Sequence, residues 1–312
     1  MWTRLAAGDG DPGAAADTGR TYGGPPAWAR LARGERVVVD EAGMLDQDSA
    51  IALLTVAGEA GATVALIGDR AQLPAVGRGG VLDMAAALNT GSGKTVFDMD
   101  SVHRFTDPTY ADLTLRLRAG HNSAPLFDQL HALGHVRVHR SADDAHDHIA
   151  AATTAAIEAT RTVAATVATN DEARSLNDRI RTQRAARGAI DDTVTVAGSD
   201  GLAIGAGDVI ATRKNDSTLG VANRQTWTVH GIGSDGTVSA VESAGSRKRH
   251  QRSVALPSSY VTDHVHLAYG VQGSTTTSAH TLLSEALDAS GVYVGMTRRH
   301  VAPEHRHPEK RH

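Results

Sequence analysis

The chain has 312 residues, of which 41% are hydrophobic and 21% charged, a composition typical of a globular protein with room for two domains. It contains no cysteine, which excludes disulfides and thiolate metal sites and weakly favours a cytoplasmic location. The net charge of −4 provides no overall basic surface, so contacts with nucleic acid have to come from local patches. We find no apolar run long enough to form a membrane segment and no signal-peptide pattern.

The first regular elements are expected after a loop or disordered start at residues 1–26. Two β-branched runs, 37–39 and 63–67, flank a helix over 49–60 that Asp48 should cap and Gly61 should end. Short apolar runs on either side of a helix predict neighbouring strands of a buried parallel sheet.

Acidic residues follow both predicted strands. Asp40 and Glu41 come directly after the first strand, and Asp69 follows the second. Ligands of parallel sheets bind at the carboxyl ends of the strands. An acidic pair there suits hydrolysis of a magnesium nucleotide, in which one carboxylate holds Mg²⁺ partly through water and the other orients or deprotonates the attacking water. The alternative is that the pair only caps the strand.

The remaining chain alternates between helical and strand patterns. Helices are predicted over 81–88, from Pro108 to a stop at Gly120, and over 122–134 and 142–160. A strand at 163–169 and a helix ending at Gly188 begin a second α/β unit. Short alternating runs predict a small all-β insert, and the α/β pattern resumes after Pro257 with a strand at 278–283 and a helix at 288–299. The alternating runs are 208–212, 225–232, 237–241 and 252–256.

Two motifs around the acidic residues resemble those of a superfamily 1 helicase. The first is VVVDEAGML (37–45), which resembles Walker B, and the second is GDRAQLPAVG (68–77), which resembles motif III. The family's later motifs follow in the family's order. They are VHRF (102–105), LRLRAG (115–120), ATN (168–170), RKND (213–216) with GVAN (220–223), YGVQGST (269–275) and YVGMTRR (293–299).

The resemblance implies an α/β fold with two RecA-like parallel-sheet P-loop NTPase domains, the first incomplete, and a small SH3-like all-β insert in the second. The first domain would cover 27–135, the second 136–199 and 258–302, the insert 200–257, and a tail 303–312. It implies ATP and Mg²⁺ as cofactors and single-stranded DNA as partner. The implied catalytic residues are Asp40, Glu41, Gln72, Arg104 and Arg298, the last in the arginine-finger position.

The same resemblance supplies the binding residues. Those expected at the nucleotide are Asp40, Gln72, Arg104, Gly273 and Arg298, and those expected at DNA are Arg213, Lys214, Asn215, Gln272, Ser274 and Thr275. The basic run 247–250 is either a further DNA contact or a solvated hairpin tip. Trp227 alternates with apolar neighbours and is expected in the core of the insert rather than at a stacking surface. The 16 histidines show no convincing metal-ligand spacing.

A Walker A motif is not found before Asp40, where the Gly-rich stretch 8–24 has no lysine. The segment TGSGKT (90–95) is similar to the end of that motif, but Leu88 stands where its first glycine is required. We interpret this segment as a surface turn. Without the phosphate-binding loop and its lysine, affinity for ATP and turnover should fall severely.

The resemblance therefore implies a piece of an ATP-dependent helicase or translocase of superfamily 1B, a family that moves 5′ to 3′ on single-stranded DNA. The LRLRAG segment favours the helicase part of a TraI/TrwC-type (MobF) conjugative relaxase, and other conjugation or recombination proteins are candidate partners. Two alternatives stay open. One is a RecD-like helicase of repair or recombination, and the other is a DNA-binding remnant without turnover.

Overall fold

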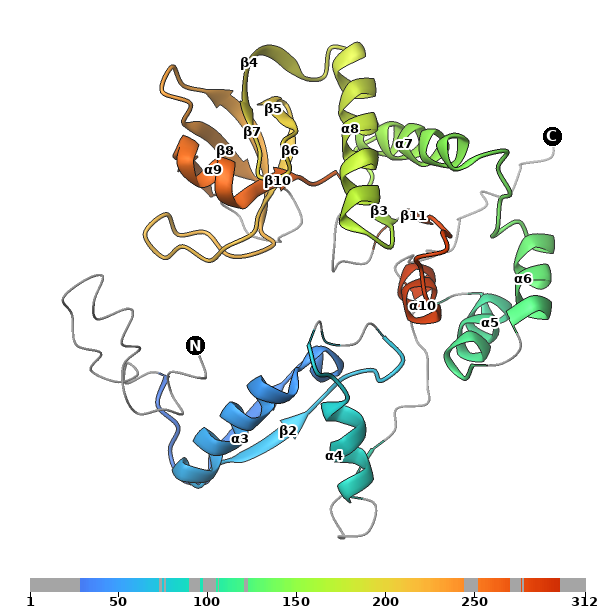
Figure 1. The fold of residues 1–312 in the computed structure, drawn as a ribbon, viewed down its shortest axis with the longest axis vertical. Coiled ribbons are helices and arrows are strands. Elements are labelled where there is room, and N and C mark those ends of the chain that lie inside the picture. The colour runs from blue at the N-terminus through green and yellow to red at the C-terminus, as the bar shows by residue number, and fades with distance from the viewer. Residues whose placement is uncertain are drawn as a thin grey trace, which may run out of the picture. The chain divides into compact units, whose positions relative to one another are not determined.

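The computed structural model describes residues 29–72, 75, 77–89, 96–97, 105, 107–120, 123–243, 252–269, 276 and 278–297. The chain divides into two compact units, Met1–Ser101 and Val102–His312 (Figure 1). The predicted end of the first RecA-like domain at residue 135 stays a prediction. Among the described residues, no helix has the length and apolar character that crossing a membrane requires.

The first unit is built on two parallel strands, β1 (Arg36–Val39) and β2 (Thr63–Leu66), as the β-branched runs predict. Helix α3 (Gln47–Ala60) connects them, and helix α4 (Val81–Asn89) follows the loop after β2. Gly61 ends α3 with a φ of 65°, in agreement with the prediction. The unit is therefore an α/β structure whose strand ends carry the predicted acidic residues.

The N-cap of α3 is Asp46, and the prediction of Asp48 was wrong. The Asp46 carboxylate accepts hydrogen bonds from the amide of Ser49 at 2.8 Å and from its hydroxyl at 2.7 Å. Asp48 already lies in the first helical turn, where its side chain pairs with Arg78 on the surface at 3.2 Å. Both aspartates precede the apolar stripe, and only the backbone conformation decides which of them caps the helix.

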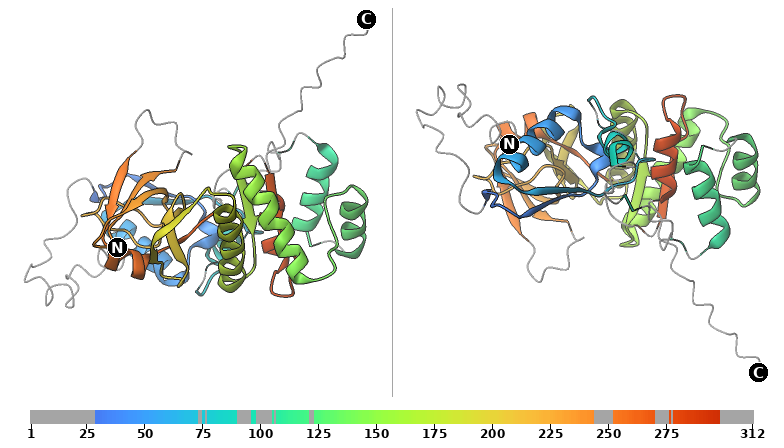
Figure 2. Two further views of the ribbon diagram at one scale, coloured as in Figure 1. Left: turned by 90° about the horizontal axis from the view of Figure 1, so that it is seen from above. Right: turned by 90° about the horizontal axis from the view of Figure 1, so that it is seen from below.

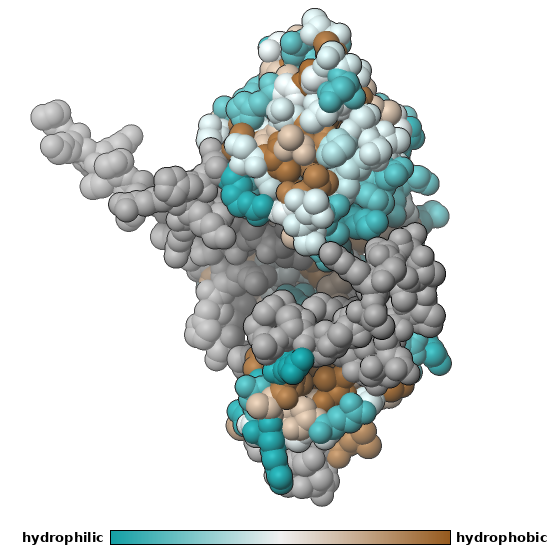
Figure 3. Space-filling model, turned by 90° about the vertical axis from the view of Figure 1, so that its left-hand side faces the viewer, coloured by the Kyte–Doolittle hydropathy of each residue, from teal (hydrophilic) through white to brown (hydrophobic). Residues whose placement is uncertain are grey.

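Much apolar surface of the first unit is exposed in its described part. Helix α3 buries the face that carries Ala50, Leu53 and Ala57. The brown areas on the lower part of the molecule in Figure 3 belong to this unit. Large apolar side chains at least two-fifths exposed are Val38, Met44, Ile51, Leu54, Ile67, Met84, Leu88, Val96 and Phe97. Parallel sheets usually have both faces covered, so the described part of this unit exposes apolar side chains of a kind that such a sheet normally buries.

The second unit contains an α/β layer. Its parallel strands are β3 (Val163–Thr166) and β11 (Ser278–Thr281), flanked by α7 (Ala142–Glu158), α8 (Asn170–Ala186) and α10 (Ala289–Thr297). Helices α5 (Pro108–Arg118) and α6 (Ser123–Ala132) precede this layer, and α5 lies beside α10 (Figures 1 and 2). The Tyr110 hydroxyl of α5 donates to the Met296 carbonyl of α10 at 3.0 Å.

An all-β insert lies between α8 and β11, as predicted. Its strands are β4 (Asp191–Ala197), β5 (Ala203–Ala206), β6 (Val209–Thr212), β7 (Thr226–Ile232), β8 (Val238–Glu242) and β9 (Ser253–Leu256). Helix α9 (Ser258–His264) then leads into β10 (Val265–Leu267), which pairs antiparallel with β6. The order β10-β6-β7-β8-β9 shows that this sheet continues past Pro257, where the sequence predicted a return to the α/β pattern.

One hydrophobic core joins the insert to the α/β layer. It contains Leu176 and Ile180 of α8, Ile149 of α7, and the inward side chains of the insert. Trp227 is fully buried within it, which confirms the prediction that this residue is core. The insert is thus packed on α8 as part of the second unit.

Candidate nucleotide and DNA sites

The predicted acidic pair lies on the surface directly after β1. Asp40 and Glu41 are both exposed, and the Asp40 carboxylate accepts the Glu41 amide at 2.9 Å. Glu41 has φ 54° and ψ 38°, in the left-handed region, and caps a 3-10 turn, η2 (Ala42–Met44). A glutamate in that region carries backbone strain, which persists only where the surrounding structure fixes the chain.

Close backbone contact holds this turn against the loop that follows β2. The amide of Ala42 donates to the Ile67 carbonyl at 2.8 Å, so the two loops continue the pairing of the strands. A Cβ atom on Gly68 would lie 2.9 Å from the amide nitrogen of Ala42, a distance that no side chain permits. The glycine of the GDRAQLP motif therefore brings the second loop to the acidic turn.

Gln72 lies in this second loop, at the edge of the sheet that carries Asp40 and Glu41. The Asp69 carboxylate accepts the Ala71 amide at 3.0 Å, and its carbonyl accepts the Gln72 amide at 3.3 Å. Gln72 is partly buried. The fold thus gathers the three predicted catalytic residues of the first unit on two adjoining loops.

The remaining predicted nucleotide residues lie outside the described part of the chain. These are Arg104, Gly273 and Arg298. The same holds for three of the predicted DNA contacts, Gln272, Ser274 and Thr275, and for the basic run 247–250.

The other predicted DNA contacts lie on a firmly held loop after β6. Arg213, Lys214 and Asn215 are exposed. The Arg213 amide donates to the carbonyl of His264 at 2.7 Å, and the Tyr260 hydroxyl donates to the carbonyl of Lys214 at 2.7 Å. Fixed backbone with exposed cations suits contacts to phosphate oxygens. Asn215 differs, because its side-chain oxygen accepts the amide of Asn223 at 2.8 Å within the loop.

The sequence patterns did not identify Asn177, whose side chain hydrogen-bonds the backbone at the start of the YGVQGST motif. The Asn177 side chain of α8 donates to the Leu267 carbonyl at 2.8 Å and accepts the amide of Tyr269 at 3.4 Å. The available signal was the spacing of Asn177, Arg181 and Arg184, which places three polar residues on one face of a helix.

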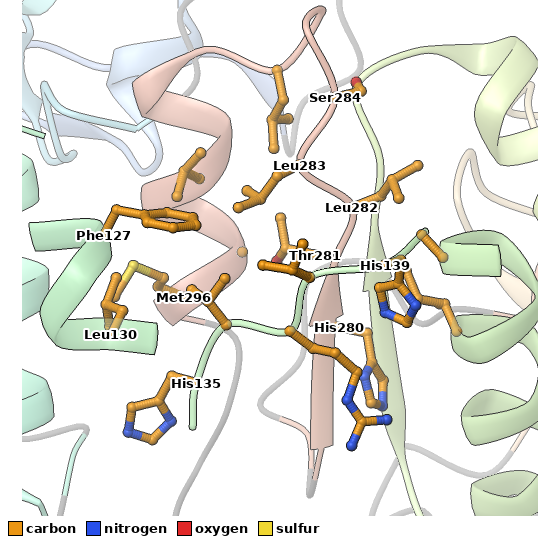
Figure 4. A pocket seen from close by; sticks show the side chains of 18 of the residues that line it. Phe127, Leu130, His135, His139, His280, Thr281, Leu282, Leu283, Ser284 and Met296 are labelled. Carbon is orange, nitrogen blue, oxygen red and sulfur yellow. The ribbon is translucent and has the colours of Figure 1, made fainter. Parts of the chain in front are cut away.

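A hollow of about 1210 Å³ lies elsewhere in the second unit, and no predicted site residue lines it. Figure 4 shows Phe127, Leu130 and Met296 on its apolar side and His139 and His280 on its polar side. Arg137 contacts the ring of His148 at 2.9 Å. Burial, followed by the charge of Arg137, lowers the pKa of His148. No group of three acidic or histidine side chains in the described residues is arranged to hold a metal ion.

Comparison with known proteins gives three findings. A family model described as an AAA domain matches residues 4–141. The probable conjugal transfer protein TraA of Sinorhizobium fredii (strain NBRC 101917 / NGR234) is 26% identical over 266 residues, which cover 84% of this chain. The chain spans only 23% of the length of that relative.

The third finding concerns the fold. A structure of Pif1 helicase from Bacteroides in complex with ADP-AlF3 and single-stranded DNA has a TM-score of 0.56 and 15% identity, covering 92% of this chain and 76% of that one. A structure of two coordinating Pif1 helicases at forked DNA has a TM-score of 0.55 and 13% identity, covering 96% and 78%. These neighbours are RecA-like, which confirms the predicted fold class. The chain is thus similar to an AAA domain over residues 4–141, to a conjugal transfer protein over most of its own length, and to Pif1 helicases in its fold.

Proposed function

We propose that this chain is part of the motor of an ATP-dependent DNA helicase that moves 5′ to 3′ on single-stranded DNA in a conjugative relaxase–helicase. The observation that carries the proposal is the acidic pair Asp40 and Glu41 at the carboxyl end of a parallel strand, on a loop joined to that of Gln72. The likeness to a conjugal transfer protein and to Pif1 structures bound to nucleotide and DNA supports it. The protein would work in the cytoplasm with other conjugation or recombination proteins.

The donor set at β1 fits a magnesium ion that keeps most of its water. Such an ion needs only one or two carboxylates when the nucleotide phosphates supply the other ligands. Asp40 is exposed and would hold the ion through water, while Glu41 would orient the attacking water. Bound magnesium would neutralise the charge that develops on the phosphates. Gln72 would contact the γ-phosphate.

A second candidate function rests on Arg213 and Lys214, which are exposed on the firmly held loop after β6. Asp40 and Glu41 supply one side of a nucleotide site, but the backbone cradle and lysine for the β- and γ-phosphates are not among the motifs. DNA binding through Arg213 and Lys214 needs neither. The second candidate is therefore a DNA-binding protein without turnover.

ATP hydrolysis with and without a single-stranded oligonucleotide tests the proposal. The chain is compared with the double variant Asp40→Asn, Glu41→Gln and with Asp48→Asn, Glu59→Gln, which changes the same residue types at exposed positions of α3. DNA-stimulated hydrolysis should fall about a hundredfold or more in the first variant and stay unchanged in the second.

Two outcomes contradict the assignment. Hydrolysis that survives loss of the acidic pair would show that Asp40 and Glu41 are not the catalytic residues. No hydrolysis in any of the proteins, together with DNA binding that Arg213→Ala, Lys214→Ala weakens, would replace the motor with the non-catalytic alternative.

A further inference from the structure

An arginine occupies a backbone position in the loop between β6 and β7 that favours glycine. Arg224 has a φ of 65°, in the left-handed region. Its amide donates to the Thr212 carbonyl at 2.6 Å, and the Thr212 amide donates to the Gln225 carbonyl at 3.0 Å. Two residues at the start of β7 therefore lie opposite one residue of β6, which is the arrangement of a G1 β-bulge. The first residue of such a bulge is normally glycine, because a side chain strains the backbone there.

Hydrogen bonds within the loop hold Arg224 in this strained conformation. Asp216 and Val221 exchange both of their backbone hydrogen bonds, each at 2.9 Å, so the tip of the loop is itself a paired turn. The Asn215 side-chain oxygen accepts the amide of Asn223, the residue just before Arg224, at 2.8 Å. Backbone strain persists only where surrounding contacts fix the chain, and it is common at binding sites.

Three exposed cations lie at this end of the β6–β7 pairing. Arg213 and Lys214 directly follow Thr212, whose carbonyl accepts the Arg224 amide. None of the three cations forms an ion pair with a residue in the described part of the chain. The acid of the loop, Asp216, is engaged elsewhere, because its carboxylate accepts the amides two and three residues further along at 2.8 and 3.0 Å. Like charges repel one another, so this end of the pairing is suited to an anion.

We infer that Arg224 is a further contact to the phosphate backbone of single-stranded DNA, and that the bulge presents it beside Arg213 and Lys214. This inference rests on the proposed function, from which DNA follows as the ligand. A guanidinium donates to phosphate oxygens through two parallel N–H groups. The loop 213–225 contains no aromatic residue on which a base could stack, so the contact reads the backbone and not the sequence.

The test compares the full chain with Arg224→Gly and Arg224→Asn. Both substitutions remove the cation, and both new residues tolerate the left-handed conformation, so the bulge is kept. Arg161→Asn is the matched control, because Arg161 is also an exposed arginine of the second unit without an ion pair in the described part of the chain. Affinity for fluorescent oligo-dT and oligo-dA is measured by anisotropy at several salt concentrations, and thermal unfolding is followed in each protein.

Both Arg224 variants should bind both oligonucleotides about three- to tenfold more weakly, with a slope of log affinity against log salt that is shallower by about 0.7, the value for one lost phosphate contact. Arg161→Asn should change neither quantity. Arg224→Gly should unfold at the same or a higher temperature, because the strain is relieved.

Four outcomes overturn the inference while the chain itself binds DNA. They are unchanged affinity in the Arg224 variants, an equal loss in Arg161→Asn, a loss confined to one of the two oligonucleotides, and a loss that accompanies a lower unfolding temperature in both variants. A chain that binds no DNA overturns the proposed function together with this inference.

Discussion

Arg181 of helix α8 forms an ion pair with Asp208, the residue just before β6. The Asp208 carboxylate is completely shielded from solvent. Arg181 also contacts Asp192 of β4, so one guanidinium links the helix to two parts of the insert. An acid in this position is tolerated only while its charge is paired.

Arg181→Met should therefore lower the free energy of unfolding by about 3–5 kcal/mol, since it leaves the Asp208 charge buried and underpaired. Urea unfolding measures the change. Arg179→Met is the control, because Arg179 pairs with Asp143 and Asp147, whose side chains are largely exposed, and should cost about 0–1 kcal/mol. Adding Asp208→Leu to Arg181→Met should recover part of the loss. Equal losses for Arg181 and Arg179 would contradict the buried-charge explanation.

Trp227 anchors the core of the insert. Replacing this fully buried side chain with alanine should cost about 3–5 kcal/mol, from lost transfer energy and the cavity left behind. Val194→Ala, at a strand position that is 52% exposed, should change stability by less than about 0.5 kcal/mol. Thermal unfolding compares the two. A small loss in Trp227→Ala, with weaker binding of single-stranded DNA, would indicate a stacking surface instead.

Local patterns in the sequence were sufficient for most elements of the fold. The β-branched runs at 163–169 and 225–232 and the stop at Gly120 predict strands and helix ends from neighbouring residues alone, and the structure places β3, β7 and the end of α5 there. The acidic pair could be placed for the same reason, because it follows a strand directly. Strand periodicity also put Trp227 in the core.

The contacts that position the second unit could not be predicted in this way. Asp208 lies 27 residues from Arg181 and 61 from Tyr269, and Asn177 lies 90 from Leu267. A single sequence gives no measure of such pairings. The left-handed conformation of Glu41 was not predictable either, because it arises from the close approach of the next loop rather than from any preference of glutamate.

Partly buried histidines should make the second unit less stable in mild acid. Burial, followed by the charge of Arg213, lowers the pKa of His266, while Asp200 partly opposes the shift. As the pH falls below the ordinary value of 6.5, the unfolded chain takes up a proton that the folded chain does not, so the free energy of unfolding decreases. His148 acts in the same direction.

Urea unfolding at pH 7.5 and pH 5.5 measures this dependence. Stability should be lower at pH 5.5, and His266→Asn should reduce the difference. The lowered pKa values of carboxylates such as Asp191 and Glu172 act only in a lower window, as the pH falls below their ordinary 3.8 and 4.5. His131→Asn, at an exposed position of α6, controls for the loss of a histidine. If stability differed between pH 7.5 and pH 5.5 as much in His266→Asn as in the unsubstituted chain, His266 would not be a source of this pH dependence.

The correct N-cap of α3 can be verified by paired substitutions. Asp46→Ala removes the acceptor of two hydrogen bonds from Ser49 and should speed amide exchange in α3 about fivefold. These bonds lower the pKa of Asp46, so their contribution is present above its ordinary value of 3.8 and is lost as the pH falls through the lower folded value. Asp48→Ala, which breaks only an exposed pair with Arg78, should have a smaller effect. A larger effect of Asp48→Ala than of Asp46→Ala on amide exchange in α3 would identify Asp48 as the cap.

Because the backbone at Glu41 is strained, replacing this residue with glycine should raise stability while it lowers ATP hydrolysis. Glu41→Gly relieves the left-handed conformation and should stabilise the first unit by up to about 1 kcal/mol, less the greater entropy that glycine loses on folding. Glu41→Ala keeps the strain and should give no such gain. Both remove the carboxylate and should abolish DNA-stimulated hydrolysis equally. Hydrogen exchange in α3 measures the effect on stability, and an ATP hydrolysis assay measures the loss of the carboxylate. Equal exchange in the glycine and alanine variants would show that the backbone at Glu41 carries no strain.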